Sequence, residues 1–121
     1  MKIRFAILLL FLFNYIYSQK EGNYWYFGNY AALNFNNGTP IALSNSAMQA
    51  FYGCSTMTDP NGNLLFYSDG ETIWNKNHNV MFNGSGLFGG NGSTQSGVAV
   101  PLPGSNHIYY IFTNRIPVKS R

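Results

Sequence analysis

Three of the four acidic residues in this 121-residue chain lie close together in sequence, at Asp59, Asp69 and Glu71. Two carboxylates two residues apart could act as a general acid and a general base, as the paired carboxylates of glycoside hydrolases do. Asp69 and Glu71 flank Gly70, and the sequence offers no partner residues that would complete a catalytic cleft around them. A secreted carbohydrate-active hydrolase that uses Asp69 and Glu71 is therefore the alternative to a non-enzymatic protein, which is the prediction that we favour.

The same stretch has part of the pattern of a calcium-binding loop. Asp59, Asn61 and Asn63 have the oxygen spacing of the first half of an EF-hand loop. That loop requires glycine at its sixth position, for a sharp turn, and glutamate at its twelfth, as a bidentate ligand. These two positions hold Leu64 and Gly70. The sequence therefore predicts no metal site, no cofactor and no catalytic residue here.

Turn formation explains the stretch better than chemistry does. Residues 59–62 read D-P-N-G, which places Asp, Pro and Gly at the first, second and fourth positions of a type I turn. The Asp side chain of such a turn accepts backbone N–H groups across it. We expect residues 64–68 to pair back on residues 54–58, and residues 69–70 to turn the chain into residues 72–74. The predicted structural turn residues are Asp59, Pro60, Asn61, Gly62, Asp69 and Gly70.

Few other residues have the spacing of a reactive site. The single cysteine, Cys54, cannot form an internal disulfide, and its strand-like neighbours predict a packed thiol rather than a nucleophile. His78 and His107 lie far apart in sequence, with no further ligand at zinc spacing beside them. Trp25 and Trp74 could stack on sugars at a loop rim, although core packing is the interpretation that we favour for both rings.

The first 18 residues have the layout of a secretory signal peptide. Lys2 and Arg4 form a short positive region, a continuous apolar run follows, and the expected cut lies between residues 18 and 19. The run is shorter than the ~20 residues that span a bilayer, so we expect membrane contact only before cleavage. Its removal leaves five basic and four acidic residues, a net charge of +1 in place of +3. No basic patch remains for nucleic acid, and residues 114–121 form only a weakly basic tail.

The rest of the chain is predicted to be all-β. Aromatic residues make up 17% of the chain and charged residues only 9%, which suits a core of large rings. Turn pairs that end in glycine recur at residues 37–38, 61–62, 69–70, 83–84, 91–92 and 103–104. Short apolar runs lie between these turns, as in antiparallel sheets of short strands. Because the runs are continuously apolar rather than alternating, we expect both faces of the strands to be covered.

Three stretches, residues 22–27, 62–67 and 105–110, resemble one another at intervals of roughly 40 residues. A period near 40 with a few strands per unit is typical of a β-propeller blade, and one such unit cannot bury both of its faces. Residues 19–113 would supply about two to three blade-like repeats, fewer than the ~4 that closure requires. The sequence therefore predicts a partial β-propeller, whose open sheet edges could self-associate.

A series of motifs occurs in order along the chain: YWYFG at 24–28, GCST at 53–56, DPNGNLLFYSDG at 59–70, IWN at 73–75, STQSG at 93–97 and P-L-PG at 101–104. The series resembles the N-terminal, β-propeller-like region of large secreted Bacteroidetes proteins. Those proteins end in a gliding-motility-associated, or type IX secretion (type B), C-terminal sorting domain. The resemblance implies export and a role in adhesion, gliding or polymer binding, with an extracellular polysaccharide or a surface protein as partner.

The end of the chain departs from this resemblance. Members of the family would continue much further, whereas residues 114–121 match no such region and no sorting domain follows them. We therefore expect a truncated fragment of a larger exported protein, or a nonfunctional gene remnant. The expected location is extracellular or at the cell surface, and the periplasm if the sorting domain is truly absent.

Overall fold

The computed structural model describes residues 19–90 and 93–114, and every regular element in these two ranges is a β-strand. They contain no helix long and apolar enough to cross a membrane. The predicted signal peptide and nearly all of the predicted basic tail lie outside the described residues. The strands are β1 (Tyr24–Phe27), β2 (Ala31–Asn34), β3 (Ile41–Leu43), β4 (Ser55–Thr58), β5 (Leu64–Ser68), β6 (Thr72–Asn75), β7 (Val80–Ser85), β8 (Gly97–Pro101) and β9 (Tyr109–Thr113).

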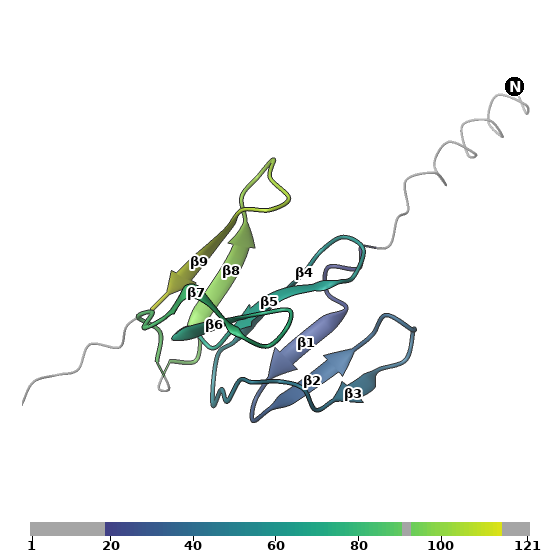
Figure 1. Cartoon of the computed structure of the whole chain (residues 1–121), viewed down its shortest axis with the longest axis horizontal. Helices are drawn as coiled ribbons and strands as arrows, with labels where there is room; N and C mark the ends of the chain where they lie inside the picture. The colour runs from purple at the N-terminus through teal and green to yellow at the C-terminus, as the bar shows by residue number, and fades with distance from the viewer. Residues whose placement is uncertain (1–18, 91–92, 115–121) are drawn as a thin grey trace, which may run out of the picture.

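The strands form three separate antiparallel sheets in the order of the chain. The first sheet is β1-β2-β3, the second is β4-β5-β6-β7 and the third is β8-β9. Within each sheet, strands that follow one another in sequence lie side by side, so that short turns join them. Figure 1 shows the four-stranded sheet between the other two. The predicted all-β class, with antiparallel sheets of short strands, is confirmed for the described residues.

The predicted turns are present at the predicted residues. The N–H of Gly62 donates to the carbonyl of Asp59 at 2.9 Å, which closes the turn between β4 and β5. The pairing then runs from Met57 opposite Phe66 to Ser55 opposite Ser68. Beyond Ser68 the chain turns again, and β6 pairs with β5 in an antiparallel register. Local turn chemistry therefore determines this part of the second sheet.

A β-bulge lies beside the first of these turns. The register between β4 and β5 shifts between Met57 and Thr58, whose partners are Phe66 and Leu64, so Leu65 is the extra residue. Leu64 joins the buried core, whereas Leu65 and Phe66 line a groove on the other side of the sheet. The bulge therefore lets two consecutive residues, Leu65 and Phe66, line the same groove, where a regular strand would place them on opposite faces.

Stacked aromatic rings hold the first and second sheets together. Tyr26 of β1 and Tyr67 of β5 stack with ring centroids 4.3 Å apart, and Tyr67 also stacks on Trp74 of β6 at 5.5 Å. Between the second and third sheets, Phe66 meets Tyr109 of β9 edge to face at 5.3 Å. The buried hydrophobic cluster consists of Tyr26, Ala32, Met48, Ala50, Leu64 and Tyr67.

The expectation that both faces of the strands are covered is wrong for the two outer sheets. It holds for β5, which is buried along nearly its whole length. Trp25 and Phe27 of β1 are 55% and 38% exposed, and Tyr110 and Phe112 of β9 are 49% and 62% exposed. The physical reason is that each outer sheet packs one face on the middle sheet, and no described element covers its other face.

Candidate functional site

The carboxylate of Asp59 caps the turn that it begins. One of its oxygens accepts the backbone N–H groups of Asn61, at 2.9 Å, and Asn63, at 2.8 Å, and the other accepts the Asn63 side-chain amide at 2.9 Å. These bonds, the one from the Asn63 side chain foremost, hold the pKa of Asp59 below its ordinary value of 3.8. Within the described residues no group of three or more acidic, histidine or cysteine side chains is placed to hold a metal ion.

This cap predicts a pH dependence of stability. Because the pKa of Asp59 is lowered on folding, its contribution is present above about pH 4 and is lost as the pH falls through the lower, folded value. Asp59→Asn retains an acceptor oxygen but has no carboxylate to protonate. We expect the loss of melting temperature between about pH 5 and pH 2 to be smaller in the variant than in the wild type. Parallel melting curves whose pH dependence is the same in both proteins would contradict the assignment.

Asp69 and Glu71 also lie in a turn, between β5 and β6. One carboxylate oxygen of Asp69 accepts the backbone N–H groups of Glu71, at 2.9 Å, and Thr72, at 2.7 Å. The buried Ser68 hydroxyl donates to the carbonyl of Thr72 at 2.7 Å and accepts the N–H of Gly70 at 3.0 Å. Asp69 therefore caps this turn, and Glu71 beside it is exposed.

Four side chains form a hydrogen-bonded chain that joins two buried tyrosines through the exposed Asn45 and the half-buried His78, and the sequence analysis missed it. The Tyr26 hydroxyl donates to the Asn45 side-chain oxygen at 3.2 Å, and the Asn45 amide nitrogen lies 2.9 Å from His78 Nε2. An amide nitrogen can only donate, so Nε2 accepts and the ring proton is on Nδ1, 3.1 Å from the Tyr67 hydroxyl. Burial raises the pKa of Tyr26 to about 12 and also raises the pKa of Tyr67. No sequence spacing links these residues, because they come from separate strands, a loop and a turn.

Cys54 has the packing role that its neighbours predict. The side chain is half-buried and lies against the core cluster, with Sγ 3.5 Å from the carbonyl oxygen of Tyr26. Burial raises the pKa of its thiol. Because the thiolate is the reactive form of cysteine, this environment disfavours a nucleophile.

The two tryptophans lie in different environments. Trp74 is half-buried and stacks on Tyr67, as the core interpretation predicts. Trp25 differs from that expectation, since 55% of it is exposed. Its indole N–H donates to the carbonyl of Gly22 at 2.8 Å, and its ring lies against that of Phe35, with centroids 5.1 Å apart. Trp25 is therefore an exposed ring whose orientation is fixed from two sides.

A groove of about 300 Å³ runs beside Trp25 along the edge of β1. The edge itself is capped by a side chain, because the Thr56 hydroxyl accepts the N–H of Tyr26 at 2.9 Å and lies 3.3 Å from its carbonyl oxygen. The lining residues are Glu21, Gly22, Tyr24, Trp25, Tyr26, Phe27, Cys54 and Thr56.

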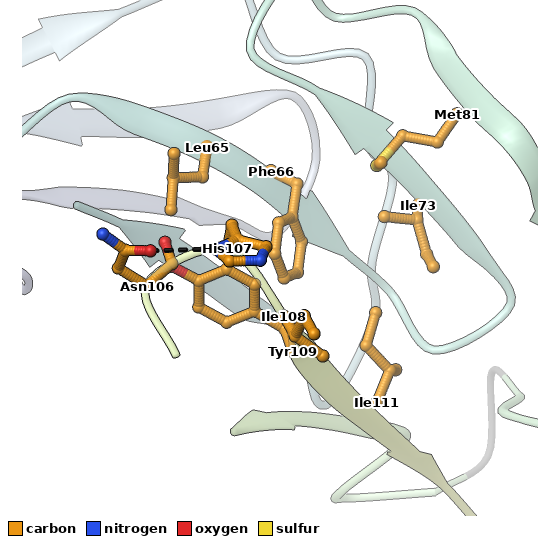
Figure 2. Close-up of a pocket in the computed structure, with 9 residues that line it drawn as sticks. All are labelled: Leu65, Phe66, Ile73, Met81, Asn106, His107, Ile108, Tyr109 and Ile111. Atoms are coloured by element: carbon orange, nitrogen blue, oxygen red, sulfur yellow. Dashed lines mark hydrogen bonds between the residues drawn. The ribbon is translucent and has the colours of Figure 1, made fainter. Parts of the chain in front are cut away.

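A larger groove, of about 530 Å³, separates the second and third sheets (Figure 2). Asn106 and His107 are its polar residues, and they are hydrogen-bonded to each other at 2.9 Å. The remaining lining is hydrophobic or aromatic, which suits apolar side chains better than a substrate that must be polarised. These lining residues are Leu65, Phe66, Ile73, Met81, Ile108, Tyr109 and Ile111.

Comparisons with known proteins give no family for the chain. A scan against protein families, a search of curated proteins and a search of solved structures each returned no match. Function must therefore be inferred from the side chains and their geometry.

Proposed function

We propose that the chain is a non-enzymatic, exported β-repeat module that adheres to an extracellular polysaccharide through the groove beside Trp25. The observation that carries this proposal is the exposure of Trp25, 55%, together with its fixed orientation. The apolar face of a sugar ring packs on an aromatic ring, while the sugar hydroxyls need polar partners close by. Glu21, which lines the same groove, offers a carboxylate that could accept such hydroxyls.

The fixed position of the ring favours binding. A side chain that is already held in place loses little conformational entropy when a ligand stacks on it. The bond to Gly22 and the contact with Phe35 hold Trp25 before any ligand arrives. Trp74 is the poorer candidate of the two predicted sugar contacts, because Tyr67 already stacks on it.

The finer architecture is also a proposal. We infer that the three sheets are blade-like units of a partial β-propeller. Two observations support this: the second sheet is a four-stranded antiparallel meander, and the repeated stretches correspond to β1, β5 and the start of β9. The resemblance to secreted Bacteroidetes proteins and the signal-like first 18 residues support export to the cell surface or beyond.

A non-enzymatic role is favoured over the hydrolase alternative by the use of the carboxylates. A catalytic acid or base must be able to reach the substrate with its reacting oxygen. One oxygen of Asp69 already accepts two backbone N–H groups across its turn, which is a structural task. Glu71 lines neither of the two grooves described above.

The test of this function is native affinity electrophoresis through gels that contain soluble β-glucan, xylan or pectin. We expect at least one polysaccharide to retard the wild-type chain, and Trp25→Ala to weaken that retardation about tenfold, the effect of losing ~1.4 kcal/mol of stacking. Phe82→Ala is the matched control, since Phe82 is a 95% exposed ring on β7, away from the groove. Retardation that survives Trp25→Ala would show that the ring is not the binding site.

A further inference from the structure

A third groove, of about 320 Å³, lies between the segment that leads into β1, the β4–β5 turn and the β8–β9 hairpin. Its volume is within the range of small-ligand sites. A carboxylate, hydroxyl groups and an amide line it beside two prolines and a tyrosine ring. The residues that carry these groups include Glu21, Pro60, Pro101, Ser105, Asn106 and Tyr109. The lining therefore combines hydrogen-bonding groups with apolar surface, as a sugar requires.

This groove meets the groove beside Trp25 at one residue. Glu21 lines both of them. The Thr58 hydroxyl donates to the carbonyl oxygen of Glu21, which holds the backbone in place at the junction. Glu21 is exposed, and no described residue hydrogen-bonds to its carboxylate. Its oxygens can therefore accept hydroxyl groups from a ligand that extends from one groove into the other.

The hairpin wall of the third groove is fixed and presents a donor. The Ser105 hydroxyl accepts the N–H groups of His107, at 3.3 Å, and Ile108, at 3.2 Å, which holds the β8–β9 turn. The Asn106 side-chain oxygen lies 2.9 Å from His107 Nδ1, while no described residue accepts from the Asn106 amide nitrogen. The groove thus offers a carboxylate acceptor and an amide donor, and sugar hydroxyls can pair with both.

We propose that the two grooves form one track for a neutral, linear polysaccharide. One sugar stacks on Trp25, the chain passes Glu21, and the sugars that follow occupy the groove beside Asn106. This inference rests on the proposed function and extends it to the length and the charge of the ligand. No residue that lines either groove is basic, and Glu21 supplies a negative charge where they meet. An acidic polysaccharide is therefore disfavoured by like-charge repulsion.

Calorimetric titration of the full-length chain with a disaccharide and a hexasaccharide tests the track. Both are prepared from β-glucan or neutral xylan, whichever retards the wild type more in gels. We expect the hexasaccharide to bind about tenfold more tightly than the disaccharide, because only the longer ligand reaches the third groove. Trp25→Ala should weaken the binding of both.

Two variants of the third groove should reduce the advantage of the hexasaccharide and leave disaccharide binding unchanged. Asn106→Ala removes the amide donor, and Pro101→Arg places a long side chain in the groove. Asn77→Ala is the matched control, because Asn77 is an exposed asparagine that lines neither groove. Circular dichroism verifies that each variant is folded.

The outcomes separate this inference from the proposed function. Equal affinities of the wild type for both lengths, or an unchanged advantage of the hexasaccharide in both groove variants, would overturn the track, although the role of Trp25 would stand. Stronger retardation by pectin, whose uronic acids are negatively charged, than by the neutral polymers would also overturn it. A wild type that no polymer retards would overturn both proposals.

Discussion

Gly70→Ala is expected to destabilise the protein by about 3 kcal/mol or more, which is enough to unfold a small domain of ordinary stability. Gly70 has φ +89°, a conformation that alanine adopts only under strain. A Cβ at this position would lie 2.4 Å from the carbonyl oxygen of Ser96 and 2.5 Å from its carbonyl carbon. Both are backbone atoms, so the clash cannot be relieved by rotating a side chain.

The position matters because three segments meet there. The N–H of Gly89 donates to the carbonyl of Gly70 at 3.0 Å, and a Cβ on Gly89 would lie 2.4 Å from the same carbonyl oxygen. The Ser96 hydroxyl in turn accepts the N–H of Gly90 at 2.8 Å. The turn between β5 and β6 is thus packed backbone to backbone against the segment that leads into β8.

Gly38→Ala separates the two causes of the loss. Gly38 has a similar φ, +82°, but nothing lies within 4 Å of a Cβ added there. The free energy of unfolding of Gly38→Ala should therefore fall by only about 1 kcal/mol, the cost of the strained backbone conformation. Urea unfolding of the two variants measures the difference. Equal losses at Gly70 and Gly38 would show that close packing against Ser96 does not contribute.

Tyr67→Ala is expected to lower the free energy of unfolding by about 3–5 kcal/mol, the range for removing a large buried ring. Tyr67 is fully buried and lies between the rings of Tyr26 and Trp74. Its hydroxyl also accepts the N–H of Ala47 at 3.0 Å, so the loop before β4 depends on it. Removal of the ring leaves a cavity between two sheets and takes away an acceptor at the same time.

A second substitution divides this loss into its parts. Tyr67→Phe keeps the stack but leaves the Ala47 N–H and His78 Nδ1 without the hydroxyl, which we expect to cost about 1–3 kcal/mol. Tyr52→Ala is the control, since Tyr52 is 56% exposed and should lose well under 1 kcal/mol. Thermal unfolding measures all three, and a Tyr67→Ala loss no greater than that of Tyr52→Ala would refute the central role of the stack.

The predictions from sequence are accurate where structure is local. A turn is determined by residues within a few positions of one another, so D-P-N-G and the Asp69-Gly70 pair were sufficient to predict the β4–β5–β6 meander. Richness in aromatic residues and the recurring glycine turns were likewise sufficient for the all-β class. Asp59 and Asp69 both accept backbone N–H groups in the turns where the sequence places them.

Only the tertiary structure decided which rings are covered. Trp25 and Tyr26 are neighbours in an uninterrupted apolar run, yet one is 55% exposed and the other 2%. Their difference depends on Tyr67, which lies far along the chain and packs on one side of β1 only. The chain of bonds through His78 has the same origin, since it joins residues that lie far apart in sequence. A continuously apolar strand does not show in its sequence which of its faces is buried, because long-range packing determines which face meets another sheet.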